Sequence, residues 1–258
     1  MSEPESHLTE TQTSRLKEEK WWTPVDPVDW SENSPQSIAL TACALGLAIG
    51  GGLCAAVLQG WQSTGGTFGL YVAIVAMYHM LEYLSVALYN PGYLEIDSFM
   101  FNPDVGNGYI TAMGVSLAEF WLEWWCGMFT GSNTRLVYLC KLVGLTMAVV
   151  GQVMRTLAMV TAKTSFNHYV ATRKEKSHRL ITHGIYAWER HPSYVGFFVW
   201  SVGLQTMLLN PISCVLFAAV LAYFFKRRVQ REERFLLRFF GREYEQYQRQ
   251  VSSLIAFI

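Results

Sequence analysis

Long apolar runs are the feature of this sequence that most limits what it can fold into. A helix that crosses a membrane needs roughly 20 predominantly apolar residues. Six stretches of the chain meet or approach that length, at residues 38–58, 68–89, 109–129, 136–162, 194–209 and 212–225. Charged residues make up only 16% of the 258 positions, whereas about 25% is usual in a soluble domain. The sequence therefore predicts an all-α integral membrane protein with about six transmembrane helices.

Basic residues are concentrated in two segments of the chain. Residues 163–191 contain six Lys or Arg, and the segment after residue 225 contains eight. Because Lys and Arg beside membrane spans favour the cytoplasmic side, both segments are expected there, and an even number of spans places the N-terminus on the same side. Residues 1–37 hold eight acidic and three basic residues and no apolar segment typical of a signal peptide. They are predicted to form a mobile cytoplasmic tail.

Ionisable side chains occur inside three of the predicted spans. Glu82 lies in the second, Glu119 and Glu123 in the third, and Arg155 in the fourth. Since an ionisable group at membrane depth costs about 2.5–3.5 kcal/mol on insertion scales, these side chains are expected to face the bundle interior and find partners. Arg155 is expected either to pair with a glutamate of the second or third span or to take a direct place in a ligand cavity.

Small residues in the spans are expected to serve packing. Gly46 and Gly50 form a small-xxx-small pattern, which allows two helices to approach closely. The five cysteines lie within or beside apolar spans and show no CxxC spacing, so we expect small buried residues, with neither a disulfide framework nor a zinc site. These cysteines are Cys43, Cys54, Cys126, Cys140 and Cys214.

Residues 163–258 combine polar clusters with a short helical hairpin, which is expected to turn at Asn210 and Pro211. The sequence RHPSY at 190–194 directly precedes the fifth apolar run. Pro192 favours a helix start there, and the first amide groups of a helix attract carboxylates or phosphates. An anion-tolerant ligand cap is expected. A simple loop-to-helix junction is the alternative, but it explains only the proline and not the imidazole and aromatic groups around it.

The histidines of this region do not indicate a metal site. Four of the six lie between residues 163 and 191, but no pair has HxxxH spacing or a CxxC companion. Further along, residues 226–251 predict an amphipathic helix on the cytoplasmic surface, ending near Gly241, and then a Tyr-rich helix. Arg228 and Glu232 lie four residues apart beyond the last span. They either form a weak ion pair on the surface or bind the polar head of a substrate.

Two segments, HGIYAWERHPSYVGFFVW and RRVQREERFLLRFFGREYEQYQRQV, closely resemble the C-terminal half of the isoprenylcysteine carboxyl methyltransferase family. The resemblance extends upstream through FNHYV at 166–170 and HMLEYL at 79–84, and covers the chain from about residue 38. Phospholipid N-methyltransferases share RHPxYxG, and sterol reductases have a related RHxNYxG. The SFNH segment and the EERFLLRFFGREYEQY continuation make the match more specific. Ala171 departs from the family, whose members carry a glutamine there that contributes to the cofactor site.

The resemblance implies transfer of a methyl group from S-adenosylmethionine to the C-terminal carboxylate of a prenylated cysteine, giving a methyl ester. It implies as substrates CaaX-processed proteins such as small GTPases, on the cytoplasmic face of the endoplasmic reticulum membrane. Residues 163–258 would be the catalytic region, after the tail at 1–37 and spans one to four at 38–162. No nucleic-acid or metal partner is implied.

The same resemblance implies the site residues. Arg228 and Glu232 are expected to be catalytic, at the substrate carboxylate. The cofactor-binding residues are expected to be His178, Arg179, Leu180, Ile181, Tyr186, His191, Pro192, Ser193 and Tyr194. No GxGxxG occurs in the chain, so the cofactor is not expected on a Rossmann unit.

The chemistry of the implied reaction agrees with these residue types. A carboxylate is already ionised at neutral pH, so its attack on a sulfonium methyl needs positioning, desolvation and a countercharge instead of a general base. A guanidinium such as that of Arg228 can bind a carboxylate through two parallel hydrogen bonds. Three other functions stay open: a phospholipid N-methyltransferase, whose amine nucleophile needs no arginine, an NADPH-dependent membrane sterol reductase, and a non-enzymatic scaffold or channel.

Overall fold

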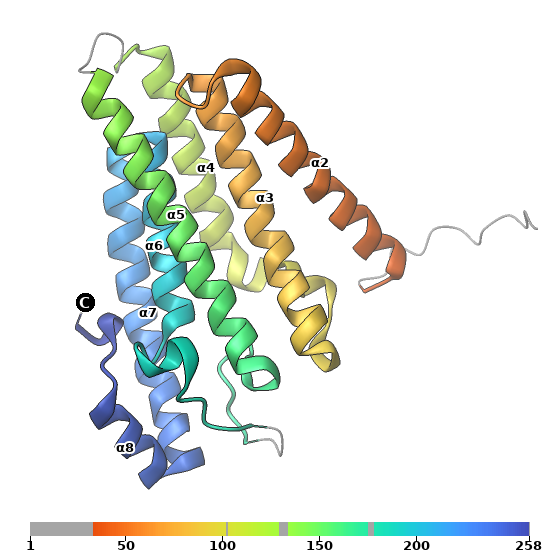
Figure 1. The fold of residues 1–258 in the computed structure, drawn as a ribbon, viewed down its shortest axis with the longest axis vertical. Coiled ribbons are helices and arrows are strands. Elements are labelled where there is room, and N and C mark those ends of the chain that lie inside the picture. Colours follow the sequence, from red (N-terminus) through yellow and green to blue (C-terminus); the bar gives the residue numbers. More distant parts are fainter. Residues whose placement is uncertain (1–32, 102, 129–133, 175–177, 258) are drawn as a thin grey trace, which may run out of the picture.

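The computed structural model describes residues 33–101, 103–128, 134–174 and 178–257. These residues form α-helices and short 3-10 helices, with no β-strand among them, so the all-α prediction is confirmed. The long helices pack side by side (Figure 1) and are α2 Pro35–Gln59, α3 Thr64–Tyr89, α4 Pro103–Trp125, α5 Thr134–Ala162, α6 Pro192–Leu208 and α7 Pro211–Phe240. A shorter helix, α8 Arg242–Gln250, follows at one end of α7.

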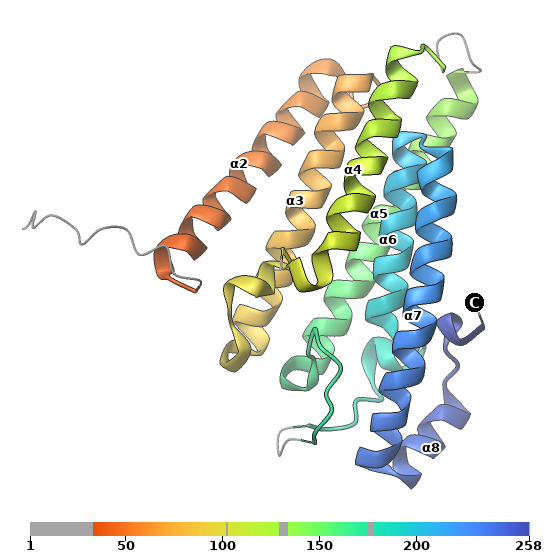
Figure 2. The same ribbon diagram turned by 180° about the vertical axis from the view of Figure 1, so that it is seen from behind.

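The connections between the helices gather mainly at the end of the bundle that carries α8. Two 3-10 helices follow α3, namely η1 Pro91–Tyr93 and η2 Ile96–Phe99. Two more lie between α5 and α6, namely η3 Lys163–Ser165 and η4 Gly184–Ala187. In both views these segments lie toward the lower end of the bundle, and α8 lies beside the lower end of α7 (Figures 1 and 2). This end therefore collects residues from distant parts of the sequence.

Local sequence signals explain where the helices begin and end. Pro192 and Pro211 occupy the first turns of α6 and α7, where a proline costs no hydrogen bond. The helical hairpin at Asn210 is thus confirmed. Because nothing interrupts the chain after the sixth predicted span, that span and the predicted amphipathic segment form one helix, α7, of 30 residues. It stops at Gly241, which has a φ of 55°.

The first long helix begins earlier than expected. Ser34 is the N-cap of α2, and its side-chain oxygen accepts a hydrogen bond of 3.1 Å from the backbone nitrogen of Ser37. The helix therefore includes Pro35–Ser37, which the sequence assigned to the predicted tail. Residues 1–32 of that tail lie outside the described residues.

Apolar length identifies three candidate membrane spans among the described residues, where six were predicted. They are α2, α3 and the segment Thr134–Ser165, which contains α5. By comparison α6 has 17 residues, fewer than the roughly 20 that a bilayer requires of a lone helix.

Glycines allow α5 and α6 to pack backbone against backbone. A Cβ atom added to Gly151 would lie 2.4 Å from the backbone nitrogen of Trp200, and one added to Gly196 would lie 2.7 Å from the Gly151 carbonyl oxygen. Gly144 on α5 and Gly203 on α6, each seven residues from this contact, approach each other in the same way. Only a residue without a side chain fits at these four positions, so the glycines hold α6 in its place on α5.

The prediction of a close contact through Gly46 and Gly50 was wrong. A Cβ atom on either of them would have no described atom within 4 Å. The close approach of α2 uses Gly52 instead, where a Cβ would lie 2.3 Å from the carbonyl oxygen of Gly69 on α3. The spacing of small residues indicated the right helix, but the rotation of α2 about its axis selected a different glycine.

We expect Gly196→Val to destabilise the protein by several kcal/mol, because overpacking a tight core typically costs about 1–3 kcal/mol and here the clash is with backbone atoms that cannot rotate away. Thermal unfolding in detergent, followed by loss of the monodisperse size-exclusion peak, measures the effect. Gly50→Val is the matched control, since its added methyl groups meet no described atom. Equal unfolding midpoints for the two variants would contradict the close packing of α5 on α6.

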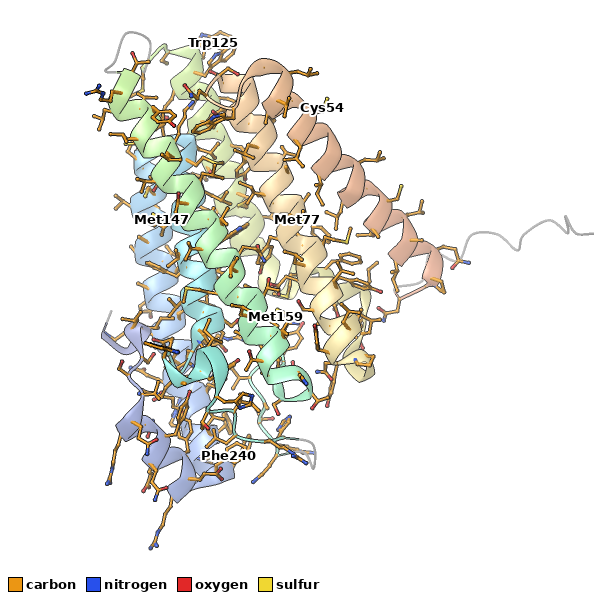
Figure 3. The ribbon with its side chains drawn as sticks, in the orientation of Figure 1. Cys54, Met77, Trp125, Met147, Met159 and Phe240 are labelled. Atoms are coloured by element: carbon orange, nitrogen blue, oxygen red, sulfur yellow. The ribbon has the colours of Figure 1, made fainter. Side chains whose placement is uncertain are left out.

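The outer faces of the helices are apolar. Leu47 and Val57 of α2 are 72% and 80% exposed, as expected for side chains that contact lipid. The cysteines follow this pattern: Cys43, Cys54 and Cys126 are exposed, so the prediction that all the cysteines are buried in the protein was wrong. Figure 3 shows Cys54 at the end of the bundle opposite to α8. A small apolar side chain is as compatible with lipid as with a protein core, so composition alone could not place it.

The ionisable side chains of the predicted third span either have hydrogen-bond partners or line a cavity. Glu119 of α4 accepts hydrogen bonds of 2.7 Å from the backbone nitrogens of Ile212 and Ser213, which satisfies the start of α7. Glu123 is 6% exposed and lines a cavity with Lys141. The expectation that the spans turn such groups inward therefore holds for this helix.

Candidate functional site

A buried ion pair joins α3 to α5 next to the polar end of the bundle. Arg155 donates from Nε and Nη2 to the two carboxylate oxygens of Glu82, at 2.5 and 2.8 Å. The side chains are 7% and 1% exposed. Nη1 of Arg155 also donates to the Ser193 hydroxyl at 3.0 Å, and His168 Nε2 lies 2.8 Å from Glu82 Oε2. The predicted pairing with a glutamate of the second span is confirmed, and Arg155 also lines a cavity.

The Tyr194 hydroxyl connects the two predicted catalytic residues. Arg228 Nε donates to that hydroxyl at 2.8 Å, and the hydroxyl donates to Glu232 Oε2 at 2.6 Å. Arg228 Nη2 donates to the carbonyl oxygen of His168. Arg228 and Glu232 share a face of α7 because they lie four residues apart. They form no direct ion pair within the described structure; the tyrosine lies between them.

Stacked rings hold Tyr194 in this position. Its ring lies parallel to that of His191, with centroids 5.7 Å apart, and stacks on Phe225 at 5.1 Å. The guanidinium carbon of Arg228 is 5.2 Å from the Tyr194 ring centre, within the range of a cation–π contact. A tyrosine held by these three contacts presents its hydroxyl in one direction.

Next to Arg228 and Glu232, a second carboxylate contacts two basic side chains. Glu233 Oε1 lies 3.2 Å from His191 Nε2 and accepts a hydrogen bond of 3.0 Å from Arg190 Nε. Burial alone raises the pKa of Glu233, but the hydrogen bond and charge of His191 and the charge of Arg190 outweigh it and lower that pKa to about 2. The carboxylate therefore stays ionised and keeps His191 oriented.

The C-terminal segment of the chain packs against the loop that precedes α6. Glu189 accepts from the backbone nitrogen of His191 at 3.0 Å and from that of Leu254 at 2.8 Å. On α8, the Tyr247 hydroxyl donates to the Tyr186 carbonyl oxygen at 2.6 Å. Burial raises the pKa of the Tyr247 hydroxyl, so it remains a protonated donor. The predicted cofactor loop is thus fixed by α8 and by the segment that follows it.

A polar cavity of about 120 Å³ lies between the 163–191 segment, the start of α6, and α7 and α8. We call it the polar cavity. It brings together eight of the nine predicted cofactor residues and Glu232: Arg179, Leu180, Ile181, Tyr186, His191, Pro192, Ser193 and Tyr194. The ninth, His178, lines an adjoining cavity with Arg179, Glu232 and Ala171.

Sequence reasoning missed several residues of the polar cavity. Phe166 and Asn167 line it from the FNHYV segment, and Tyr244 and Tyr247 line it from α8. The signal for the tyrosines was their spacing of three, which places both on one face of a helix. Burial, together with the charge and hydrogen bond of Glu233, raises the pKa of the Tyr244 hydroxyl, so this hydroxyl stays protonated.

A second cavity of about 140 Å³ adjoins the first and is mostly aromatic. We call it the apolar cavity. Its aromatic side chains are Tyr78, Phe101, Phe166, Tyr194, Phe197, Phe224 and Phe225. Arg228 also lines it, and Ser193 and Tyr194 line both cavities. Tyr194 therefore lies where the polar cavity meets the apolar one, and Arg228 is bonded to it from the apolar side.

The described residues contain no group of three His, Cys, Asp or Glu side chains arranged to hold a metal ion. What the site offers is a fixed guanidinium, the carboxylate of Glu232, the ionised carboxylate of Glu233, protonated tyrosine hydroxyls and aromatic faces. Such groups bind and orient an anionic substrate and a cationic cofactor without metal ligands.

Comparison with known proteins supports a specific family. The model of the isoprenylcysteine carboxyl methyltransferase family matches residues 143–238. A Rattus norvegicus protein named protein-S-isoprenylcysteine O-methyltransferase is 41% identical over 221 residues, covering 86% of this chain and 75% of its own. The protein of that name from Saccharomyces cerevisiae is 40% identical over 193 residues, 74% of this chain and 80% of its own.

Two further similarities cover most of the relatives' length. A Schizosaccharomyces pombe protein of the same name is 39% identical over 237 residues, 86% of this chain and 95% of its own. A solved structure described as the eukaryotic intramembrane Ras methyltransferase ICMT superposes with a TM-score of 0.78 at 38% identity, covering 86% of this chain and 77% of that chain. Together with the geometry of the two cavities, these matches show that the chain belongs to the isoprenylcysteine carboxyl methyltransferase family.

Proposed function

We propose that this protein transfers a methyl group from S-adenosylmethionine to the C-terminal carboxylate of a prenylated cysteine and so forms a methyl ester. The observation that carries this proposal is the position of Arg228 in the wall of the apolar cavity, bonded to Tyr194, which lines the apolar and the polar cavity. A prenylated cysteine has an apolar chain and a carboxylate a few atoms apart, which is the combination that this arrangement fits.

The polar cavity suits S-adenosylmethionine. That cofactor supplies an electrophilic methyl group on a sulfonium sulfur. Pro192 has no N–H, and the amides of Tyr194 and Val195 donate to the His191 carbonyl oxygen, so the Ser193 amide is the donor that the start of α6 offers to the cofactor's carboxylate or sugar. Glu232 and the ring of Tyr194 line the same cavity, and both favour a bound cation. His178 and Arg179 extend the site into the adjoining cavity.

Arg228 and Glu232 are proposed to act on the substrate carboxylate. Of the bonds described for the Arg228 guanidinium, none uses Nη1, so that group can donate to a carboxylate. Tyr194 and the His168 carbonyl hold the guanidinium in place, which lowers the entropy lost when the substrate binds. Glu232 orients Tyr194 and through it Arg228. No general base is required because the nucleophile is already an anion at neutral pH.

The membrane arrangement follows from the same proposal. A prenyl chain would enter the apolar cavity from the lipid, between helices, while the cofactor reaches the polar cavity from water. We propose six spans, with both termini and the catalytic region at 163–258 on the cytoplasmic side of the endoplasmic reticulum membrane. The basic residues of that region favour this orientation. Substrates would be CaaX-processed proteins such as small GTPases.

We expect His191→Ala to weaken S-adenosylmethionine binding about tenfold. His191 is 5% exposed, lines the polar cavity and stacks on Tyr194, so its removal loosens the wall that faces the cofactor. Titration calorimetry with the detergent-purified protein measures the affinity. His183→Ala removes an exposed imidazole that does not line the described cavity and serves as the control. Equal affinities for His191→Ala and the unmodified protein would remove His191 from the cofactor site.

The proposed activity is tested by supplying labelled S-adenosylmethionine to the purified protein with N-acetyl-farnesylcysteine or with phosphatidylethanolamine. The proposal predicts base-labile label on farnesylcysteine, because a carboxyl methyl ester is hydrolysed by base. Label on the phospholipid would instead make the protein an N-methyltransferase. If neither acceptor is labelled, binding of NADPH would indicate a sterol-type reductase, and binding of neither cofactor a scaffold or channel.

A further inference from the structure

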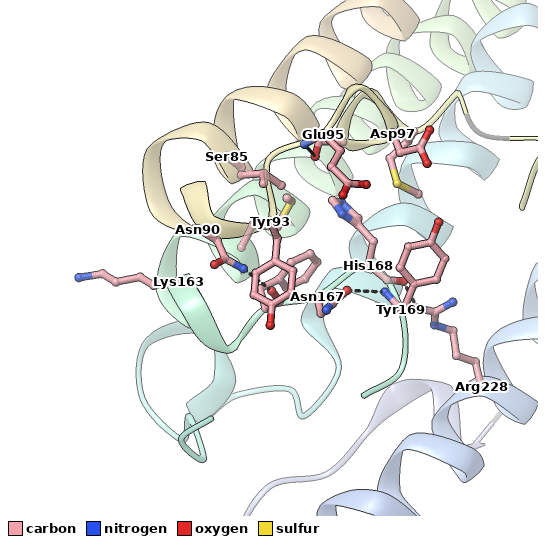
Figure 4. A pocket seen from close by; sticks show the side chains of 15 residues that line it. Ser85, Asn90, Tyr93, Glu95, Asp97, Lys163, Asn167, His168, Tyr169 and Arg228 are labelled. Atoms are coloured by element: carbon pink, nitrogen blue, oxygen red, sulfur yellow. Dashed lines mark hydrogen bonds between the residues drawn. The ribbon is translucent and has the colours of Figure 1, made fainter. Parts of the chain in front are cut away.

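A third cavity, of about 300 Å³, lies at the same end of the bundle and is not used by the proposed cofactor or prenyl chain. Its walls come from the end of α3, from η1 and η2, from the segment that follows α5, and from Arg228 (Figure 4). Tyr93 and Tyr169, which line it, are 46% and 55% exposed. It is therefore accessible from outside the protein.

The three cavities meet at a small group of shared residues. Asn167 and Phe166 line all three. Arg228 and His168 line the third cavity and the apolar cavity. A ligand group at the Arg228 guanidinium thus lies where the apolar cavity and the third cavity meet, next to Tyr194, which also lines the polar cavity.

A prenylated cysteine at the end of a protein has three attachments that need three exits. Its thioether carries the prenyl chain, its carboxylate is the nucleophile, and its amide nitrogen leads to the rest of the polypeptide. With the prenyl chain in the apolar cavity and the carboxylate between Arg228 and the cofactor, the polypeptide has the third cavity as its exit.

The charges of the third cavity favour a basic polypeptide. Glu95, the N-cap of η2, and Asp97 within η2 lie on one wall, whereas the side chain of Lys163 extends outward, away from the other lining residues (Figure 4). With the substrate carboxylate opposite Arg228, the carboxylates of Glu95 and Asp97 are the acidic groups along the lining of this cavity. Glu95 is also fixed, because its side chain and that of Ser98 form a reciprocal cap on η2.

We infer that the third cavity binds the residues that precede the prenylated cysteine and that Glu95 and Asp97 make it select for lysine or arginine there. Exposed Tyr93 and Tyr169 add aromatic faces on which the alkyl stems and cationic heads of such side chains pack. This inference rests on the proposed methyl transfer and adds to it a preference for one class of substrate sequence.

The test compares two farnesylated peptides that differ only in the two residues before the cysteine, Lys-Lys in one and Glu-Glu in the other. We expect kcat/KM to be about fivefold higher for the lysine peptide, because exposed charge pairs contribute modestly, and we expect the ratio to fall as salt is added. The double variant Glu95→Gln, Asp97→Asn should bring the ratio close to one. Asp97→Lys should favour the glutamate peptide.

The ratio between the peptides is the readout, since a fault in folding or in cofactor binding lowers both rates together. Glu243→Gln removes an exposed carboxylate of α8 that does not line this cavity and should keep the unmodified ratio. If the unmodified protein methylates N-acetyl-farnesylcysteine but the kcat/KM ratio of the two peptides is near one, the inference is overturned while the proposed function stands. A lysine preference that persists in the double variant would also overturn the inference. Failure to methylate N-acetyl-farnesylcysteine would overturn the proposed function and the inference with it.

Discussion

Arg228→Ala is expected to lower methyl transfer by about a hundredfold to a thousandfold, the range seen when a preorganised group that stabilises reacting charge is removed. The guanidinium is held by the Tyr194 hydroxyl and the His168 carbonyl at the boundary of the apolar cavity. Without it, the substrate carboxylate would lose the guanidinium that faces it in a largely apolar cavity. S-adenosylmethionine affinity should be nearly unchanged, because Arg228 does not line the described polar cavity.

The neighbouring arginine provides a matched control. Arg227 points to Tyr223, whose hydroxyl accepts from Arg227 Nη1 at 2.8 Å on an exposed face, so Arg227→Ala should keep a near-normal rate. Arg228→Lys should recover only part of the activity, since a lysine keeps the charge but not the planar pair of donors. Single-turnover methylation of farnesylcysteine measures the rates, and calorimetry measures cofactor affinity. A near-normal rate in Arg228→Ala would exclude this residue from the reaction.

Glu82→Ala is expected to destabilise the protein by about 3–5 kcal/mol, the usual cost of leaving one partner of a buried ion pair alone. The carboxylate satisfies two donors of Arg155 and lies against His168 while being 1% exposed. Its loss leaves a charged guanidinium inside the helix bundle. The measurement is the unfolding midpoint of the detergent-solubilised protein, by tryptophan fluorescence against denaturant.

A double variant separates charge burial from loss of packing. Glu82→Leu combined with Arg155→Met replaces the pair by apolar groups of similar volume, so most of the lost stability should return. Its activity should stay low, because Arg155 also donates to the Ser193 hydroxyl in the wall of both cavities. If the single variant is as stable as the unmodified protein, the pair does not hold α3 to α5.

Local chemistry was predictable from the sequence. Apolar length predicted helices, the prolines at 192 and 211 predicted where two of them begin, and Gly241 predicted where α7 ends. Each signal acts between residues within about one turn of each other, so no tertiary information is needed to interpret it. The RHPSY segment and the spacing of Arg228 and Glu232 identified candidate site residues for the same reason.

The tertiary structure decided which distant residues meet. The sequence left Arg155 a choice among the glutamates of two spans, and the rotation of α3 and α5 about their axes selected Glu82. It placed Tyr194 between Arg228 and Glu232, and it turned Gly52 instead of Gly46 toward α3. A helix has apolar residues on all sides when lipid and protein are equally apolar neighbours, so periodicity cannot fix its rotation. The sequence by itself determined the helices and the reactive residue types, and only close packing between helices determined their partners.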